Sequence, residues 1–284
     1  MLLGDLVRKG ADYLEKSGVE QSLREAKYIL SDILGEDFIY LVTNEKEPTS
    51  LKIKEAFFSY IEQRASRKPL SKIRGRRFFY GYEFLISCKT LDPRPESETI
   101  IEAVLKNVDK KDELNILDLG TGSGCLILTL LSELRNAKGM GVDVCPDALS
   151  IAKKNAAKLG VEERVHFLQS NWMKEVNKNK KFDVIVSNPP YIEEDMIDAL
   201  EPEVRLNDPR IALSGGKDGL QCYDQIIKEL SQSLSKGAKI FFEIGAGQED
   251  KILYMMKREG YLCKRKFYDL SNHARCLELK KSLC

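Results

Sequence analysis

The stretch NILDLGTGSG, residues 115 to 124, decides the fold of this chain. Its first five residues predict a buried strand, glycines follow at positions 120, 122 and 124, and a helix is predicted to begin at Cys125. Glycine is needed where the backbone passes close beneath a ligand or adopts a positive φ, because a Cβ would collide there. This order predicts a nucleotide-binding turn in an α/β domain, and a tight turn without a ligand is the alternative.

The spacing of the glycines and the residues after the next two strands narrow the class of ligand. The order is GxGxG, with Cys125 where a dinucleotide fingerprint has its third glycine, so the usual pyrophosphate site is missing. The predicted strand 138–142 ends at Asp143, whose carboxylate can accept hydrogen bonds from both ribose hydroxyls or, alternatively, cap the next helix. After the third strand, Trp172 offers a flat face and Asn171 an amide to an adenine ring, with a plain core role as the alternative for Trp172.

Short apolar strands alternate with amphipathic helices on both sides of this turn. Strands are predicted at 115–119, 138–144, 164–169 and 182–187, with helices beginning at Cys125 and Pro146. A helix over 223–234 and strands over 239–244, 261–267 and 274–279 follow. The alternation predicts an α/β fold with about seven strands in a mostly parallel, Rossmann-like sheet. The long polar segment 193–219 is a candidate lid.

The part of the chain before residue 93 has a different pattern. Apolar residues recur at helical spacing from residue 2 to about residue 67, with Gly35 placed to end the second helix and Pro48 and Thr49 to open the next. Beyond Pro69 the period becomes two on both sides of Gly81. We expect a helical N-terminal domain over 1–75, a β-hairpin linker over 76–92 and the α/β domain over 93–284.

Composition excludes several classes of protein. Hydrophobic residues make up 43% and charged residues 31% of the chain, and 45 basic against 44 acidic side chains leave a net charge of +1. These values argue against disorder and against a global attraction to nucleic acid or membranes. No apolar run is long enough to cross a bilayer and no signal peptide is evident, so a cytoplasmic location is expected. The seven cysteines are scattered and only two histidines are present, so neither disulfides nor a metal site are expected.

The tetrapeptide Asn188-Pro189-Pro190-Tyr191 follows the fourth predicted strand directly. Each proline fixes its own φ and restricts the residue before it, so the Asn188 side chain has a set direction. Since neither proline has an N–H, the Asn188 side-chain oxygen and the Pro189 carbonyl remain as acceptors for a planar NH₂ group, and Tyr191 supplies a flat wall. The lone pair of such a nitrogen is delocalised, so orientation must supply most of the catalysis. A stiffened loop without a ligand is the alternative.

The order of glycine turn, strand-end acid and third-strand ligand resembles the class I S-adenosylmethionine-dependent methyltransferases over about residues 90 to 284. The resemblance implies S-adenosylmethionine as cofactor, S-adenosylhomocysteine as product and no metal. The cofactor-binding residues that it implies are Gly120, Thr121, Gly122, Ser123, Gly124, Asp143, Trp172 and Asn188.

NPPY-type motifs occur in enzymes that methylate adenine N6 or cytosine N4 of DNA and in those that methylate protein glutamine, so the tetrapeptide alone does not choose. PRPESE (93–98), EPEVR (201–205), GGKDGL (215–220) and FEIG (242–245) resemble the HemK/PrmC-type protein-glutamine N5-methyltransferases over nearly the whole length, with Ser97 where threonine is frequent. This resemblance implies that the substrate is the glutamine of the GGQ motif in class-1 peptide chain release factors. The implied catalytic residues are Asn188, Pro189 and Tyr191, and the implied substrate-binding residues are Asn188, Pro189, Pro190 and Tyr191.

Two alternatives and one sequence feature stay open at this stage. A sister group methylates a glutamine of a ribosomal protein with the same motif, and a DNA adenine N6-methyltransferase is the more distant alternative. EPEVRLNDPRIAL, residues 201 to 213, fits the release-factor enzymes better. The stretch from Arg64 to Arg77 holds seven basic residues and no acid. Because the whole chain is nearly neutral, we interpret it as a solvated face or a docking site for an acidic protein rather than for nucleic acid.

Overall fold

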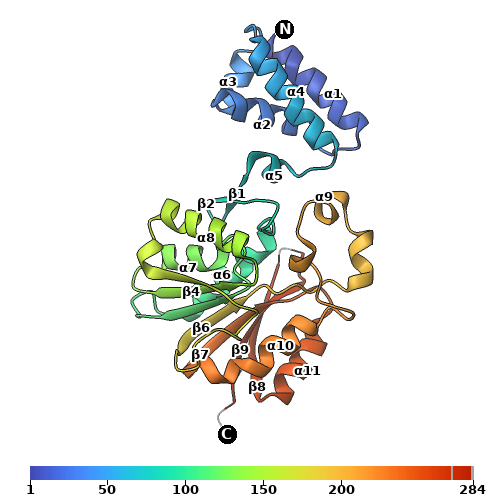
Figure 1. The fold of residues 1–284 in the computed structure, drawn as a ribbon. Helices are drawn as coiled ribbons and strands as arrows, with labels where there is room; N and C mark the ends of the chain where they lie inside the picture. The colour runs from blue at the N-terminus through green and yellow to red at the C-terminus, as the bar shows by residue number, and fades with distance from the viewer. Residues whose placement is uncertain (270, 283–284) are drawn as a thin grey trace. The chain divides into compact units, whose positions relative to one another are not determined.

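The structure is a computed structural model that describes residues 1–269 and 271–282. It divides into two compact units, one formed by residues 1–75 with 201–207, the other by 76–200 with 208–284 (Figure 1). Among the described helices, none combines the length and apolarity that a membrane span requires. The described cysteines are free thiols, and Cys284 lies outside the described residues.

The first unit is a helical domain around one apolar core. Its helices are α1 (Leu3–Lys16), α2 (Ser22–Leu34), α3 (Phe38–Thr43), α4 (Leu51–Ala65), α5 (Leu70–Arg74) and, from the later segment, α9 (Pro202–Arg205). Gly35 ends α2 with a φ of 73°, as expected from its position. The expected start of the next long helix at Pro48 and Thr49 is wrong. That helix begins at Leu51, because the Ser50 hydroxyl accepts a hydrogen bond from the Ile53 N–H and caps it.

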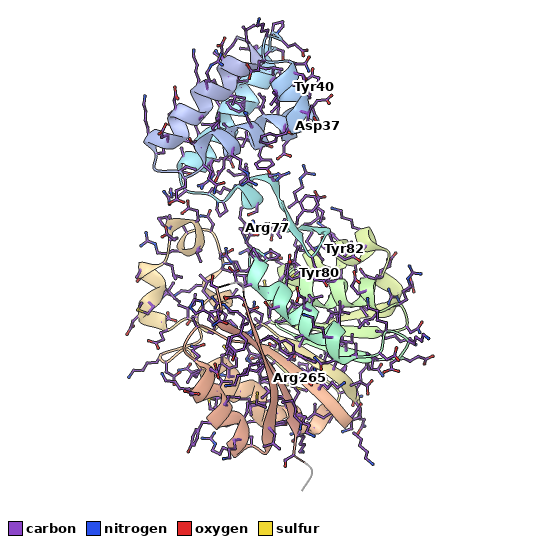
Figure 2. All side chains as sticks on the ribbon, turned by 180° about the vertical axis from the view of Figure 1, so that it is seen from behind. Asp37, Tyr40, Arg77, Tyr80, Tyr82 and Arg265 are labelled. Carbon is purple, nitrogen blue, oxygen red and sulfur yellow. The ribbon has the colours of Figure 1, made fainter. Side chains whose placement is uncertain are left out.

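The short helix α3 was not anticipated from the sequence, and it is capped locally. The Asp37 carboxylate accepts a hydrogen bond from the Tyr40 N–H at 2.8 Å (Figure 2). The Tyr40 hydroxyl in turn donates to Glu47. Within the core, Leu6, Leu14 and Phe57 are fully buried.

The arginines of the 64–77 stretch are engaged in ion pairs within their own units. In the first unit, Glu203 of α9 pairs with Arg64 at 3.1 Å and with Arg67 at 2.8 Å. Arg64 also pairs with Glu25, and its side chain is only 8% exposed. Arg74 pairs with Asp32, and in the second unit Arg76 and Arg77 pair with Glu83 and Asp92. The interpretation as a solvated face is therefore wrong for Arg64 and does not describe Arg67 and Arg74 well, since their side chains are 8%, 28% and 21% exposed and paired. Arg76 and Arg77 are paired as well but stay more than a third exposed.

The second unit opens with the hairpin β1 (Arg76–Phe79) and β2 (Tyr82–Leu85), paired antiparallel. The Tyr82 hydroxyl donates to Glu133 at 2.9 Å, and Tyr80 and Tyr82 lie beside the helices of this unit (Figure 2). Asn155 is fully buried: its carbonyl accepts from the Leu85 N–H, and its NH₂ donates to the Leu85 and Ser123 carbonyls. One amide thus ties the hairpin to the glycine turn.

A seven-stranded sheet in the order β5-β4-β3-β6-β7-β9-β8 forms the body of this unit (Figure 1). Its strands are β3 (Asn115–Leu119), β4 (Lys138–Asp143), β5 (Val165–Gln169), β6 (Phe182–Ser187), β7 (Leu234–Glu243), β8 (Tyr261–Tyr268) and β9 (Ala274–Lys281). Its helices are α6 (Glu98–Asn107), α7 (Cys125–Glu133), α8 (Pro146–Leu159), α10 (Gln221–Leu230) and α11 (Glu249–Arg258). Strands β3 to β7 are parallel, whereas β9 is antiparallel to both of its neighbours.

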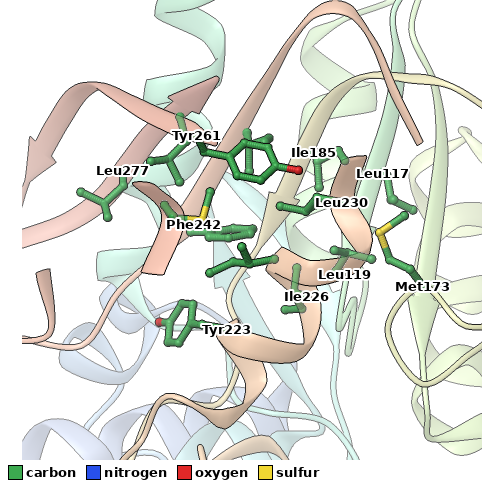
Figure 3. Packing of buried hydrophobic residues seen from close by; sticks show 14 of the residues in the cluster. Leu117, Leu119, Met173, Ile185, Tyr223, Ile226, Leu230, Phe242, Tyr261 and Leu277 are labelled. Carbon is green, nitrogen blue, oxygen red and sulfur yellow. The ribbon is translucent and has the colours of Figure 1, made fainter. Parts of the chain in front are cut away.

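Helices cover both faces of the sheet, as parallel strands require. Along β3, Leu117 and Leu119 face the cluster that packs on α10 and α11, while Ile116 faces the cluster under α6, α7 and α8. Figure 3 shows the first cluster, in which Tyr223 and Phe242 are fully buried. The sheet order reverses at β3, so the crevice at the carboxyl ends of the strands opens there.

Two boundaries near residue 234 also differ from the expectation. The expected helix 223–234 ends at Leu230 and is followed by a 3₁₀ turn over Ser231–Ser233, and the expected strand 239–244 begins already at Leu234. Leu234 pairs with Phe182, after which the register shifts before the regular pairing of Lys239 with Val184. The early start of β7 is a long-range pairing, which local periodicity does not reveal.

Candidate functional site

A cavity of about 380 Å³ lies at the carboxyl ends of β3, β4, β5 and β6, within the second unit. This volume is within the range of small-ligand pockets. The lining residues are Lys89, Thr90, Leu91, Gly120, Gly122, Asp143, Val144, Cys145, Ala148, Ser170, Asn171, Trp172, Asn188, Pro190, Pro209, Ile211, Ala212, Ser214 and Cys222.

The three glycines after β3 do different work. Gly122 has a φ of 55°, and a Cβ there would meet no atom within 4 Å, so its backbone borders open space. Gly120, at φ 77°, lies under the ring of Trp172, whose Cζ3 would be 3.3 Å from an added Cβ. Gly124 faces the protein interior, because a Cβ there would lie 2.8 Å from Leu128 of α7. Two glycines therefore shape the cavity and the third allows α7 to pack.

Thr121 and Ser123 alternate with the glycines and point away from the cavity. The Thr121 hydroxyl donates to the fully buried carboxylate of Asp118 at 2.6 Å. Burial raises the pKa of Asp118 to about 7, against the effect of that hydrogen bond. Ser123 is buried, and its carbonyl is held by Asn155. Both residues fix the turn and lie outside the lining.

Asp143 ends β4 with both carboxylate oxygens in use. Oδ2 accepts the Gly122 N–H at 2.8 Å, and Oδ1 accepts the Cys145 N–H at 2.9 Å. Burial raises the pKa of Asp143, and the two backbone hydrogen bonds oppose that rise. Each oxygen has a second lone pair, so the carboxylate can hold the glycine turn and still accept a hydroxyl from the cavity. The structural and the ligand-binding interpretations of this residue are compatible.

Trp172 is held beside the glycine turn by several contacts. Its backbone has a φ of 54°, uncommon for a large side chain. The Ser170 hydroxyl donates to the Trp172 carbonyl at 2.7 Å, and the indole Nε1–H donates to Gln225 of α10 at 2.9 Å. With its hydrogen-bonding edge satisfied and its ring over Gly120, Trp172 presents an apolar surface to the cavity.

The NPPY segment follows β6, whose last residue is tied to β3 by a hydrogen bond from the Ser187 hydroxyl to the Leu119 carbonyl at 2.7 Å. The Asn188 NH₂ donates to the Ser97 hydroxyl at 3.0 Å. Asn188 and Pro190 line the cavity, whereas Pro189 is buried. Tyr191 lies outside the lining and packs against the core under α10 and α11. Its carbonyl accepts from Gln248 at 2.8 Å, and burial raises the pKa of its phenol to about 12.

Behind Asn188 lies an acid that the sequence analysis did not single out. Glu243, the last residue of β7, is 1% exposed. Burial raises the pKa of Glu243 to about 7, while hydrogen bonds from Ser97 and Asn188 and the charge of Arg275 act in the opposite direction. The residue lies in the FEIG stretch, but that stretch alone does not predict that Glu243 lies close to Asn188.

Two loops supply further lining residues of the cavity. Lys89, Thr90 and Leu91 follow the hairpin, and residues 209–214 belong to the polar segment interpreted as a lid. Asp208 joins the two loops, because its buried carboxylate accepts from the Asp92 N–H and pairs with Arg94. These lining residues were not predicted from the sequence. They lie in or beside the PRPESE and EPEVRLNDPRIAL stretches. Those stretches support the family resemblance but assign no role to any single residue.

Of the predicted site residues, Gly120, Gly122, Asp143, Trp172, Asn188 and Pro190 line one cavity. Five other predicted site residues are near the cavity in the chain but do not line it: Thr121, Ser123, Gly124, Pro189 and Tyr191. Within residues 1–269 and 271–282, no group of three or more His, Cys, Asp and Glu side chains is arranged to hold a metal ion.

Comparison with known proteins gives the family. A family model described as the PrmC N-terminal domain matches residues 5–75, and one described as a methyltransferase domain matches residues 110–270. A release factor glutamine methyltransferase from Caulobacter vibrioides is 37% identical over 264 residues, covering 93% of this chain and 91% of that protein. The one from Rhodospirillum rubrum is 37% identical over 278 residues, covering 98% and 84%.

Solved structures bear on the fold. A methyltransferase from Pyrococcus furiosus matches with a TM-score of 0.53 at 20% identity, covering 72% of this chain and 91% of that one. With the seven-stranded sheet, this confirms the predicted class I methyltransferase fold. The matched domains and the identity of the full-length relatives lead to one conclusion: the chain belongs to the release factor glutamine methyltransferase family.

Proposed function

We propose that this protein transfers the methyl group of S-adenosylmethionine to the side-chain amide nitrogen of the glutamine in the GGQ motif of class-1 peptide chain release factors. The observation that carries the proposal is the position of Asn188 and Pro190 in the same cavity as the glycine turn and Asp143. A methyl donor and an amide acceptor bound there would be neighbours. The release factor as substrate is supported by the relatives that share 37% identity over more than nine-tenths of this chain.

The lining residues fit an adenosyl group. Open space beside Gly122 leaves room for a ligand against the turn, and Asp143 retains lone pairs for ribose hydroxyls. Trp172 would cover the adenine ring. When bound, S-adenosylmethionine supplies an electrophilic methyl group on a sulfonium. Three residues of the turn would contribute to cofactor binding only by holding the turn in shape: Thr121, Ser123 and Gly124.

The acceptor is a poor nucleophile, so the protein must aim it. The Asn188 side-chain oxygen and the Pro189 carbonyl would each accept one N–H of the glutamine amide, which turns its nitrogen toward the methyl group. A nitrogen held in this way could accept the methyl group as its bond to sulfur breaks, with S-adenosylhomocysteine as the product that leaves. The nitrogen then sheds one proton. Tyr191, next to Pro190, stays a proposed contact of the glutamine side chain.

The N-terminal helical domain is proposed to recognise the release factor and to take no part in the chemistry. Its charged side chains pair with one another, as in the contacts of Arg64 with Glu25 and Glu203. A substrate that works on the ribosome would place the protein in the cytoplasm. The ion pairs of the 64–77 stretch do not favour nucleic acid as the substrate.

A comparison of methyl acceptors tests this function. The protein is incubated with S-adenosylmethionine carrying a labelled methyl group and, in separate reactions, with a class-1 release factor, ribosomal proteins or DNA. We expect label in the release factor alone. Label that enters only ribosomal protein or only DNA would establish one of the two alternative substrates instead.

A further inference from the structure

The register of the sheet brings a buried acid next to the NPPY segment. Strands β6 and β7 are parallel, and Ser187 pairs with Phe242. The next residues along these strands, Asn188 and Glu243, are therefore neighbours at the carboxyl edge of the sheet. Ser97, from the turn before α6, accepts a hydrogen bond from the Asn188 NH₂ at 3.0 Å and lies next to the Glu243 carboxylate, whose pKa it lowers.

The burial of Glu243 costs stability and therefore calls for a functional reason. Its carboxylate is almost fully buried, and its Oε2 has no hydrogen-bond partner among the described residues. A buried carboxylate with one unsatisfied oxygen destabilises a fold. Local rules of this kind are broken mostly at functional sites.

The chemistry of the three side chains fixes the direction of each hydrogen bond. Above its pKa of about 7 the Glu243 carboxylate is ionised and can only accept, so the Ser97 hydroxyl beside it turns its single proton toward that carboxylate. The Ser97 oxygen is then an acceptor, and it is the NH₂ group of Asn188 that must face it. The same NH₂ lies near the Glu243 carboxylate, whose negative charge attracts a donor, and the NH₂ in turn lowers the pKa of that acid. The Asn188 oxygen is left for the cavity.

We infer that Glu243, partly through Ser97, fixes which way the side-chain amide of Asn188 points and is thereby a positioning residue for the methyl acceptor. The inference rests on the proposed function. The two orientations of an asparagine amide have nearly the same shape, and only the hydrogen-bond partners distinguish them. In the reversed orientation the Asn188 NH₂ would face the NH₂ of the substrate, and two donors repel. Glu243 prevents that reversal.

The central test is a pair of exchanges at positions 188 and 243. Glu243→Gln can donate as well as accept, so the orientation of Asn188 is no longer imposed. Asn188→Asp places two carboxylates side by side. The double variant Asn188→Asp with Glu243→Gln restores a donor facing an acceptor, since the new glutamine NH₂ can donate to the new aspartate and leave its other oxygen for the substrate.

The measurement is single-turnover methyl transfer to release factor at pH 8 with saturating S-adenosylmethionine. Glu243→Gln is expected to lower the rate about tenfold or more, the scale for losing hydrogen bonds to a charged group. The rate of Asn188→Asp should be lower still, and the rate of the double variant should be about tenfold higher than that of Asn188→Asp. Affinity for S-adenosylmethionine, measured by calorimetry, should stay within about twofold in Glu243→Gln, because Glu243 does not line the cavity.

Control variants separate positioning from general stability. Glu278→Gln changes another buried carboxylate of the same sheet, on β9 opposite Phe241, and should keep the wild-type rate. Ser97→Ala removes the hydroxyl between Glu243 and Asn188, and its rate of methyl transfer should fall as much as that of Glu243→Gln. Ser97→Thr keeps a hydroxyl, so its rate should fall less. If Glu243→Gln does not fold, the Ser97 pair decides.

A wild-type rate in Glu243→Gln or in Ser97→Ala, or a double variant no faster than Asn188→Asp, would overturn the inference. Failure of the proposed function is a separate result. In that case the wild-type protein itself transfers no methyl group to release factor.

Discussion

Replacing Asp143 tests the proposed methyl-donor site most sharply, because its two oxygens already hold two backbone amides. Asp143→Ala removes both acceptors, so the Gly122 and Cys145 N–H groups lose their partner. Asp143→Asn keeps the shape but places an NH₂ group against one of these N–H donors. The exposed Asp147, on the outer face of the first turn of α8, provides a matched control as Asp147→Asn.

The expected magnitude follows from the hydrogen bonds that the carboxylate can offer. A hydrogen bond to a charged group contributes about 1.5–3 kcal/mol, and losses at one residue do not add fully. We expect Asp143→Ala to weaken S-adenosylmethionine binding by about 10- to 100-fold. Asp143→Asn should be no better than alanine, since its amide opposes a backbone donor and disturbs the turn that carries Gly122.

Isothermal titration calorimetry gives the affinities, and thermal unfolding without ligand gives the cost to the fold. The ligand-free unfolding temperature should fall in both Asp143 variants and stay unchanged in Asp147→Asn. An unchanged dissociation constant in Asp143→Ala would refute the assignment of this residue to the ribose. Good binding by Asp143→Asn would refute the hydrogen-bond polarity inferred at the turn.

The remaining predictions concern the acceptor side, the N-terminal domain and pH. Asn188→Ala should lower kcat for release factor about a hundredfold or more at saturating S-adenosylmethionine, because the acceptor is no longer aimed; near-normal turnover would remove NPPY from the mechanism. A protein of residues 71–284 should bind S-adenosylmethionine but methylate intact release factor poorly, and a full rate would contradict the proposed recognition role. The truncation also removes Arg64, the ion-pair partner of Glu203. Adding residues 1–70 back as a separate chain is therefore the control for this loss. Burial raises the pKa of both Asp118 and Glu243 to about 7, above their ordinary values of 3.8 and 4.5. The folded state therefore favours their protonated forms, and the free energy of unfolding should fall by about 2 kcal/mol between pH 6 and pH 8. Denaturant titrations should show about half that fall in Glu243→Gln, and an equal fall would assign the effect to other groups.

The parts of the fold that depend on local signals could be predicted from the sequence. The strand, glycine turn and helix around residues 115–133 are encoded within one short stretch, and Gly35 marks a helix end through its φ. The parallel sheet followed from the alternation of apolar strands and amphipathic helices. The start of β7 at Leu234 could not be predicted in this way, because it depends on a pairing with Phe182, 52 residues earlier in the chain.

The same distinction holds for the site. The strand-end residues Asp143 and Asn188 were identified because ligands bind at the carboxyl edge of such sheets. The further lining of the cavity comes from the loop after Asp208, and the neighbours of Asn188 are Ser97 and Glu243, all distant from Asn188 in the sequence. Their proximity depends on strand register and on ion pairs such as that of Asp208 with Arg94. The burial of Arg64 could not be predicted for the same reason, since its acidic partners Glu25 and Glu203 lie elsewhere in the chain.

The most direct test of the central claim is to locate the methyl group on the product. Class-1 release factor is incubated with the protein and S-adenosylmethionine, digested, and analysed by tandem mass spectrometry beside a release factor whose GGQ glutamine is replaced by alanine. We predict one added methyl group on the side-chain nitrogen of that glutamine, and none in the alanine variant. A methyl group on any other residue, or equal methylation of the alanine variant, would contradict the account.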